Sequence, residues 1–235
     1  MVHAPLCQEY LENVTKRANM MGMKVNGSKT QLLCVTSAIN YQVRSSIDFG
    51  NSTLVSGDSL KVIGYTYGRR PGAAEHVKSL RRKYGSRAYS IRHLKKASTA
   101  EEVLVEVHKS FIQPVFDYAS PAFHTILTDE QAESLEKLQW STLKTIYGFD
   151  VTYKDCLERA GIPTLRERRQ ILFEKYARKA YEDEHYKGKW FRPKEKSVYG
   201  LRKEERVVQL FANCDRLRNA PLYRIRQFIN ESYSD

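Results

Sequence analysis

The fold is decided by the stretch RRPGAAEHVKSLRRKYGSRAYSIRHLKK, residues 69–96. Pro71 and Gly72 interrupt regular structure and mark the point where extended patterning gives way to helical patterning. Residues 73–96 predict one or two basic helices, with Gly85 as the candidate break. Because helical patterning continues to the end of the chain, the sequence predicts an α+β fold that is mainly α.

The same stretch carries most of the positive charge. Ten Lys and Arg residues stand against Glu75 alone, which gives a net charge of +9 out of +12 for the whole chain. A solvated charged surface normally mixes both signs, so this block predicts a polyanionic partner, either RNA or DNA. An acidic protein or a lipid surface is the alternative. The predicted nucleic-acid-binding residues are Arg69, Arg70, Lys78, Arg81, Arg82, Lys83, Arg87, Arg92, Lys95 and Lys96.

The spacing of these cations suggests how they would bind. The helical intervals at 78, 81, 82 and 92 place several cations on one face. About six phosphate contacts would give a slope of about −5 for log K against log salt on duplex DNA. Tyr84 and Tyr89 lie among the cations and are expected either to stack on bases or to pack in the core.

Residues 1–68 are predicted to form one helix packed on a small, mainly antiparallel sheet. The helix follows from an apolar stripe at Cys7, Leu11, Val14, Ala18 and Met21. Gly22 stands where a glycine commonly ends a helix. The predicted extended segments are residues 32–35, 43–49 and 60–67.

Helix-start signals divide the remainder of the chain. Ser98 and Glu101 have the spacing of a capping box, which predicts a helix that Pro114 ends or bends. Its expected inward residues are Val103, Leu104, Val107, Phe111 and Ile112. Thr128 predicts a second helix, which Gly148 closes, with an inward stripe at Ala132, Leu135, Leu138, Thr142 and Ile146. A capping box of Thr164 and Glu167 predicts a third helix through Ala180, and residues 204–214 and 222–232 are weaker helical candidates.

Composition limits the class of protein. Hydrophobic residues make up 41% and charged residues 28%, as in soluble globular chains. No apolar run approaches the ~20 residues of a membrane span, and the first residues lack the apolar segment of a signal peptide. We therefore expect no membrane partner and an intracellular location, nuclear or cytoplasmic. The four cysteines lack zinc-site spacing and are predicted to be buried thiols, and the six histidines are predicted to be packing or surface residues.

Seven motifs follow one another along the chain. They are residues 22–30 (GMKVNGSKT), 60–68 (LKVIGYTYG), 76–77 with the basic helix, 110–121 (SFIQPVFDYASP), 135–148 (LEKLQ to IYG), 161–169 (GIPTL to RR) and 216–226 (RLRNAPLYRIR). In this order they resemble the C-terminal part of LINE-type (non-LTR) retrotransposon reverse transcriptases, over essentially the whole chain. Phe123 departs from the family pattern, which usually has tryptophan there.

The resemblance implies three regions and a partner. Residues 1–70 would be a remnant of the polymerase palm with its primer-grip hairpin, residues 71–150 a basic helical thumb, and residues 151–235 a helical C-terminal extension. In this family the thumb follows the template–primer duplex along its minor groove and backbone. Binding would then be directed by shape rather than by base sequence.

The resemblance also bears on catalysis. Nucleotidyl transfer uses two divalent metal ions held by carboxylates. The family carries these aspartates just before the first residues of this chain, and Met1–Ala4 would continue the strand that follows them. The acidic runs here, at 101–102, 129–130, 182–184 and 204–205, follow no short buried strand. We therefore expect no metal site and no polymerase activity from this chain alone, although a complete enzyme would require Mg²⁺.

Lys29 resembles the family lysine that protonates the departing pyrophosphate. In this chain it is expected to be either a leftover general acid or phosphate contact, or a turn lysine in solvent. Three functions stay open at this stage. The chain is a fragment of a reverse transcriptase, or a host-adopted nucleic-acid-binding or scaffold module, or a partner that completes a separately encoded palm. An open sheet edge in residues 1–68 would also allow self-association.

Overall fold

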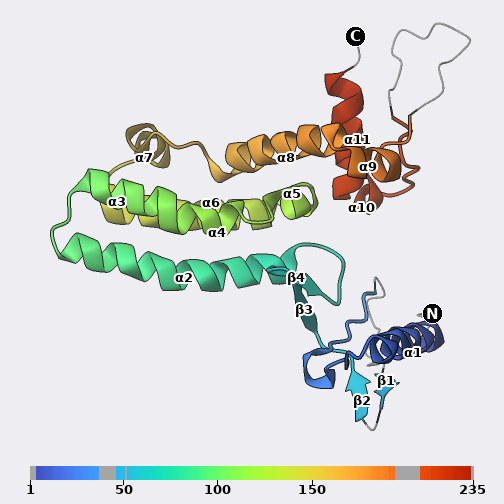
Figure 1. Cartoon of the computed structure of the whole chain (residues 1–235). Coiled ribbons are helices and arrows are strands. Elements are labelled where there is room, and N and C mark those ends of the chain that lie inside the picture. The colour runs from blue at the N-terminus through green and yellow to red at the C-terminus, as the bar shows by residue number, and fades with distance from the viewer. Residues whose placement is uncertain (1–3, 37–45, 51, 194–206, 234–235) are drawn as a thin grey trace, which may run out of the picture. The chain divides into compact units, whose positions relative to one another are not determined.

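A computed structural model describes residues 4–36, 46–50, 52–193 and 207–233. Its contacts divide the chain into two compact units, Met1–His76 and Val77–Asp235. The described residues form mostly helices, with two antiparallel sheets of two strands each (Figure 1). The predicted α+β, mainly α class is therefore confirmed. No helix in the described part of the chain is both long and apolar enough to cross a membrane.

The first unit opens with helix α1 (Ala4–Met20). Gly22 has a φ of 72°, and the backbone N–H of Met23 donates to the Ala18 carbonyl at 2.8 Å, so the predicted glycine ending is confirmed. The predicted apolar stripe is less buried than expected, since Leu11 and Ala18 are only half-buried and three of its members, Cys7, Val14 and Met21, are exposed. The expectation that residues 1–4 continue a strand fails at Ala4, which is helical, while residues 1–3 lie outside the described part.

Two hairpins follow. Strand β1 (Ser46–Phe49) pairs with β2 (Ser52–Val55), and β3 (Ser59–Val62) pairs with β4 (Tyr65–Gly68). The antiparallel pairing was predicted, but the segment 60–67 holds parts of two strands rather than one. The strand expected at 32–35 is reduced to an isolated parallel bridge between Leu33 and Gly57. Residues 43–45 of the other predicted segment lie outside the described part.

Gln8 ties helix α1 to the edge of the first hairpin. Its side-chain oxygen accepts from the Asp48 N–H at 2.7 Å, and its side-chain NH₂ donates to the Asp48 carbonyl at 3.1 Å. The amide therefore occupies the outward-facing backbone groups of one residue of an edge strand. At this point of β1, the edge expected to be open is covered from within the unit.

The turn after α1 needs a glycine. Helix η1 (Gly27–Lys29) is a 3₁₀ turn capped by the Asn26 side chain. A Cβ placed on Gly27 would lie 2.9 Å from the ring of Phe49, closer than real Cβ contacts come. This close approach packs the turn against the end of β1.

The β3–β4 hairpin is anchored on the last residue of the first unit. His76 is fully buried, its ring stacks on Tyr65 at 4.3 Å, and its Nδ1 accepts from the Thr66 N–H at 3.3 Å. Burial raises the pKa of Tyr65 to about 12. His76 is thus a packing residue, as predicted.

Helix α2 (Ala74–Lys96) runs unbroken through Gly85, so the alternative of two basic helices does not apply. It ends where Ser98 takes a φ of 56° and the Thr99 N–H donates to the Leu94 carbonyl. The predicted capping box at Ser98 is wrong for this reason, because Ser98 closes α2. Helix α3 (Glu101–Val107) instead starts after Ala100, which makes no side-chain cap.

A π-helical turn, η2 (His108–Ile112), follows α3 directly. The chain then continues through α4 (Gln113–Asp117), α5 (Ser120–Phe123) and the 3₁₀ turn η3 (His124–Ile126). Pro114 lies in the first turn of α4, where its missing N–H is tolerated. Of the residues expected inward, Leu104 and Ile112 are buried, but Val103 and Phe111 are exposed. Val105 and His108 are buried instead, so the inward stripe of this segment runs through Leu104, Val105, His108 and Ile112, at helical steps that leave Val103 and Phe111 outside.

Local capping chemistry predicted two of the three following helices well, α6 (Asp129–Tyr147) and α8 (Leu165–Glu182). Helix α7 (Tyr153–Ala160) lies between them and was not predicted, although the Thr152 side chain caps it. Thr128 with Gln131 and Thr164 with Glu167 form complete capping boxes. Gly148 has a φ of 104° at the end of α6, as expected of a closing glycine.

The chain closes with α9 (Glu184–Trp190), α10 (Asp215–Arg218) and α11 (Pro221–Ser232). The last of these confirms the helix predicted at 222–232. The candidate at 204–214 is wrong over residues 207–214, which are not helical, and residues 204–206 lie outside the described part. A small core between α8 and α11 contains Phe173, Ala177, Ala180, Phe191, Val207, Ile225 and Ile229.

The four cysteines were predicted to be buried thiols. Cys34 and Cys156 are buried, whereas Cys7 and Cys214 are exposed, so the prediction is wrong for two of them. Cys7 lies on the exposed side of α1 and Cys214 is the N-cap residue of the short helix α10.

Candidate nucleic-acid interface

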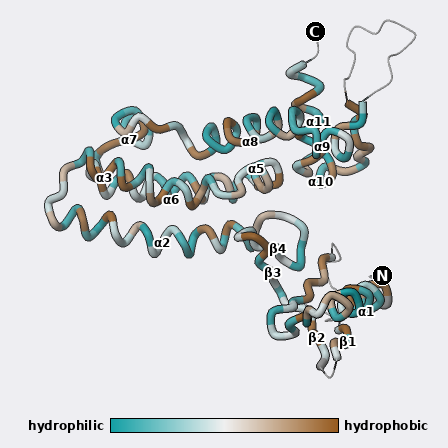
Figure 2. The backbone as a smooth tube through the Cα atoms, viewed as in Figure 1, coloured by the Kyte–Doolittle hydropathy of each residue, from teal (hydrophilic) through white to brown (hydrophobic). Residues whose placement is uncertain are grey.

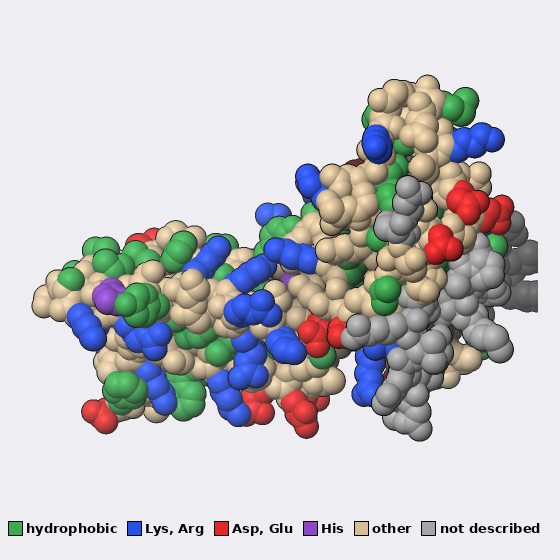
Figure 3. Space-filling view, turned by 90° about the horizontal axis from the view of Figure 1, so that it is seen from below, with side chains coloured by type: hydrophobic (Ala, Val, Ile, Leu, Met, Phe, Trp, Pro, Cys, Tyr) green, Lys and Arg blue, Asp and Glu red, His purple; other side chains and the backbone are tan. Residues whose placement is uncertain are grey.

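Helix α2 has one apolar and one basic side. Its buried residues Val77, Leu80, Tyr84, Ala88 and Ile91 recur at steps of three and four, as one stripe of a helix does. The hydropathy along the chain alternates accordingly (Figure 2). Lys78, Arg81, Arg82, Tyr89, Arg92 and Lys96 are all exposed and fall on a second stripe, which we call the basic face. Figure 3 shows lysine and arginine side chains spread over the surface that includes this helix.

The apolar side fixes the helix in place. The Tyr84 hydroxyl is hydrogen-bonded to Thr142 Oγ1 of α6 at 2.8 Å, and its ring lies 5.8 Å from that of Phe116 in α4. At the other end, Lys95 Nζ donates to the Ile146 carbonyl at 2.7 Å. In Figure 1, α2, the region of α3 to α6, and α8 are stacked in layers. The basic face is therefore presented on a rigid element.

Several of the predicted binding residues have structural partners. Arg87 donates to the Phe111 carbonyl and lies 4.7 Å above the centre of the Phe111 ring. Lys95 also pairs with Glu101 at 3.4 Å. In the first unit, Arg69 pairs with Asp58 at 3.3 Å. These three cations hold structure together as well as contributing charge.

The ten predicted cations are thus divided among three places. Lys78, Arg81, Arg82, Arg92 and Lys96 share the basic face. Lys83 and Arg87 lie on the opposite flank of the buried stripe and are half-buried, as is Lys95. Arg69 and Arg70 belong to the first unit, where Arg70 is exposed.

The basic face concentrates like charge. Within the part of the chain that the structure describes, the side chains of Arg81, Arg82, Arg92 and Lys96 make no hydrogen bond or ion pair. Pairs such as Lys78 with Arg82 and Arg92 with Lys96 are four residues apart, where like charges destabilise a helix by about 0.2–0.5 kcal/mol each. A polyanion would remove this repulsion and replace it with attraction.

The two tyrosines of α2 differ in burial. Tyr84 is buried and belongs to the core, whereas the side chain of Tyr89 is 58% exposed on the basic face. His93 packs edge-on against Tyr89, with ring centres 4.1 Å apart. Sequence reasoning did not single out His93, although its position four residues after Tyr89 on a helix was the available signal. Tyr89 therefore offers an exposed aromatic face among cations.

Lys29 lies in the first unit, in the 3₁₀ turn η1. Its side chain is exposed, and its backbone N–H donates to Asn26 Oδ1 at 3.3 Å. This is the position expected of a turn lysine in solvent.

The acidic runs considered for metal binding have other partners. Glu101 pairs with Lys95, Asp129 lies 3.8 Å from Arg166, and Glu184 pairs with Lys187. Residues 204–205 lie outside the described part. Among the residues that are described, no three His, Cys, Asp or Glu side chains gather where they could hold a metal ion. The divalent metal ion implied by the resemblance thus has no ligand set among them.

The histidines lie in the core or at the surface. His76 and His108 are buried, His93 and His185 are exposed, and His124 is partly buried and hydrogen-bonded to Gln170 at 2.8 Å. His3 lies outside the described part.

Compared with protein-family models, curated proteins and solved structures, this chain matches none of them.

Proposed function

We propose that this chain binds nucleic acid through the basic face of α2. The observation that carries the proposal is the alignment of five exposed cations on one side of a single rigid helix, with no acidic side chain among them. Such a surface suits a regular array of phosphates better than it suits a protein or a lipid, because its charges follow a line.

The dimensions support backbone binding. From Lys78 to Lys96 the helix rises about 27 Å at 1.5 Å per residue. Duplex DNA carries one charge per about 1.7 Å of its axis, so many phosphates lie within reach of this length. Five contacts would give a slope of about −4.5 for log K against log salt. Binding would depend on the shape and charge of the duplex, since the face offers a line of cations that matches the phosphate backbone.

We further propose that the chain is the C-terminal, nucleic-acid-binding part of a LINE-type reverse transcriptase, whose partner is a template–primer duplex. The order of the seven motifs supports this origin. So does the succession of a β hairpin at residues 59–68, a long basic helix and a helical C-terminal region. The complete enzyme would be an RNA-directed DNA polymerase that uses Mg²⁺, and this chain would supply binding rather than the metal-dependent step.

The other class of function is a host-adopted binding or scaffold module. The two origins differ in the genomic reading frame before Met1. A frame that continues upstream into a strand ending in two adjacent aspartates supports the polymerase origin. A frame closed by its own promoter supports the host-adopted module, which would use the same basic face.

The binding proposal is tested by measuring the affinity of the purified chain for a primer–template duplex over a range of salt concentrations. The triple variant Arg81→Ala/Arg82→Ala/Arg92→Ala should bind more weakly. Its slope of log K against log salt should be less steep by about 2.7, since three contacts are lost.

The control removes the same amount of charge elsewhere in the second unit. Lys137, Lys154 and Lys175 are exposed lysines of α6, α7 and α8. Changing them together to Ala should leave most of the affinity intact. Equal losses in the two triple variants would show that net charge, rather than the basic face, attracts the duplex.

A further inference from the structure

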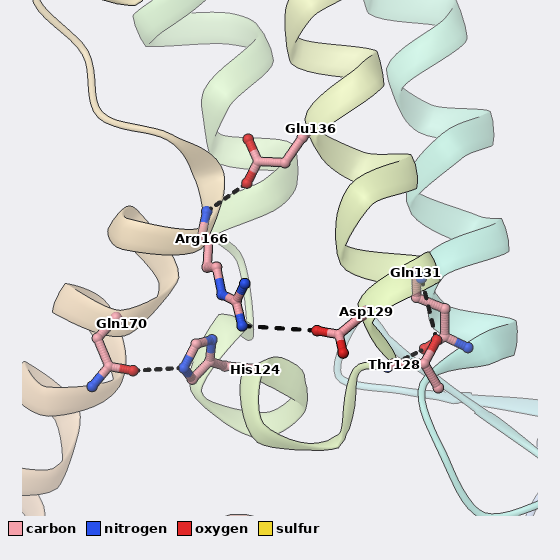
Figure 4. Close-up of polar contacts among 7 residues, drawn as sticks. All are labelled: His124, Thr128, Asp129, Gln131, Glu136, Arg166 and Gln170. Carbon is pink, nitrogen blue, oxygen red and sulfur yellow. Dashed lines mark hydrogen bonds and ion pairs between the residues drawn. The ribbon is translucent and has the colours of Figure 1, made fainter. Parts of the chain in front are cut away.

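The second unit contains a cavity of about 1060 Å³ that lies apart from the basic face of α2. It is bounded by α8, by α11 and by the segment from His124 to Ala132. Figure 4 shows part of its wall, where His124 and Gln170 meet and Arg166 reaches toward Asp129. The hollow is open to solvent on one side, and its volume is at the upper end of the range for small-molecule sites.

Arg169 is a buried cation in the wall of this cavity. Its side chain is only 2% exposed, and its Nε and Nη1 have no hydrogen-bond partner. Glu136 is the carboxylate that favours its charge, but the oxygens of Glu136 already accept from the Tyr153 hydroxyl and from the N–H groups of Leu165 and Arg166. Burial lowers the pKa of Arg169 for lack of a direct partner. A buried guanidinium without a partner destabilises the fold unless something compensates it.

A second guanidinium lines the cavity from α11. Arg224 donates to the side-chain oxygens of Gln227 at 3.1 Å and Asn219 at 2.7 Å, which are both neutral amides. The amides hold the guanidinium in place without neutralising it. Arg169 and Arg224 therefore bring two positive charges to one cavity, and neither forms an ion pair with a carboxylate among the described residues.

The carboxylates that line the cavity have hydrogen-bond or ion-pair partners other than Arg169 and Arg224. Glu167 accepts hydrogen bonds within the cap of α8, from the Thr164 N–H at 3.0 Å and the Thr164 hydroxyl at 2.9 Å. Asp129 is 98% exposed and lies 3.8 Å from Arg166. Glu231 accepts from Gln227 at 2.9 Å. They leave the two arginines available to an anion.

The positive charges around the cavity affect the pKa of His124. Burial lowers the pKa of its imidazole, the hydrogen bond to Gln170 opposes the change, and the positive charges of Arg169 and Arg166 lower the pKa further. An anion bound beside these arginines would raise that pKa, which supplies a direct readout.

We propose that this cavity binds a small organic phosphate, with Arg169 and Arg224 neutralising the phosphate group. Phe228, Ile171 and Leu127 line the cavity as well and suit an apolar or planar organic part. Planar guanidinium groups match phosphate oxygens in two-pronged hydrogen bonds, which favours a phosphate over a halide. This site is independent of duplex binding by α2.

The test uses adenosine monophosphate as the probe and inorganic phosphate as the competitor. Calorimetry on the full chain at about 0.15 M ionic strength should show saturable binding of the nucleotide. Arg224→Gln should weaken that binding at least tenfold, because a charged hydrogen-bond donor is lost. The pKa of His124, followed by NMR of its imidazole, should rise when the nucleotide is added.

Lys175→Gln is the matched control, since it removes one positive charge from the exposed surface of α8 outside the cavity. It should bind the nucleotide as the unaltered chain does. Absence of saturable binding at millimolar concentrations, or equal weakening in the two variants, would overturn the proposal. If inorganic phosphate bound as tightly as the nucleotide, the proposal that the ligand has an organic part would be overturned. Duplex affinity should be unchanged in Arg224→Gln, so failure here and failure of the basic-face proposal are distinguishable.

Discussion

Arg168 of α8 forms a bidentate ion pair with Asp117 of α4, in which its Nε and Nη2 each donate to a carboxylate oxygen at 2.7 Å. The hydrogen bonds from Arg168 to Asp117 raise the pKa of the arginine. Both side chains are partly buried, with exposed fractions of 35% and 20%. This pair joins residues 110–121 and 161–169, two of the seven motifs, which the sequence presents as separate.

The first prediction concerns this ion pair. Asp117→Asn should lower the free energy of unfolding by about 2 kcal/mol, because it leaves a partly buried guanidinium without its charged partner. The measurement is urea denaturation at neutral pH. Lys154→Gln breaks an exposed pair with Glu158 at 3.9 Å and should change the free energy by less than about 0.5 kcal/mol. Similar losses in the two variants would mean that the Arg168–Asp117 contact contributes no more than a surface pair.

The parts of the fold that the sequence predicted are those set by local chemistry. Thr128 and Thr164 cap helices because a hydroxyl and a residue three positions later satisfy the first N–H groups, whatever lies around them. Ser98 has the same spacing to Glu101, yet it closes α2 in a left-handed conformation. The competition between ending one helix and starting the next is decided by packing, which the local pattern does not contain.

The same distinction applies to the candidate sites. The spacing of the cations predicted the basic face of α2, because one face of a helix follows from its period. The spacing did not predict which single cations are buried. Arg168 and Arg169 are neighbours, but one forms an ion pair near the surface and the other is buried beside a cavity. Which neighbour is buried depends on where α8 lies on α6 and α11, and this comes from contacts distant in sequence.

A second prediction is that His108 makes the free energy of unfolding fall at acid pH. It is fully buried in the π turn, neither ring nitrogen has a partner, and burial with Lys109 nearby lowers its pKa from 6.5 to about 4. The folded state then holds fewer protons than the unfolded state between these values. Stability is full above about pH 6.5 and falls by roughly 2–3 kcal/mol as the pH drops to about 4.

The change that checks this is His108→Leu. It should flatten the stability curve between pH 6.5 and 4, and at neutral pH it should be neutral or stabilising, since it removes two unsatisfied buried nitrogens. Urea denaturation at a series of pH values gives the curve. His185→Leu, at an exposed position of α9, should keep the slope of the unaltered chain. A slope that persists in His108→Leu would assign the acid sensitivity to other groups.

A third prediction concerns the β3–β4 turn. Ile63 and Gly64 form a two-residue loop with φ values of 45° and 80°, and such loops favour Asn-Gly. A β-branched residue at positive φ is strained by about 1–2 kcal/mol. Ile63→Asn should therefore raise the free energy of unfolding of the first unit by about 1 kcal/mol. Hydrogen exchange of the hairpin amides measures this, with Ile63→Val as the control that keeps the branch. Equal protection in the two variants would mean that the turn carries no strain.

A fourth prediction distinguishes the two tyrosines of α2. Tyr89→Ala should weaken the binding of a single-stranded oligonucleotide by about 1–3 kcal/mol, because an exposed ring among cations can stack on a base. Tyr84→Phe removes only the buried hydroxyl that meets Thr142, so it should lower stability by about 1 kcal/mol and leave binding unchanged. Fluorescence anisotropy and denaturation of the same preparations measure both quantities. Unaltered affinity in Tyr89→Ala would make the basic face a purely electrostatic surface, and binding would then follow charge alone.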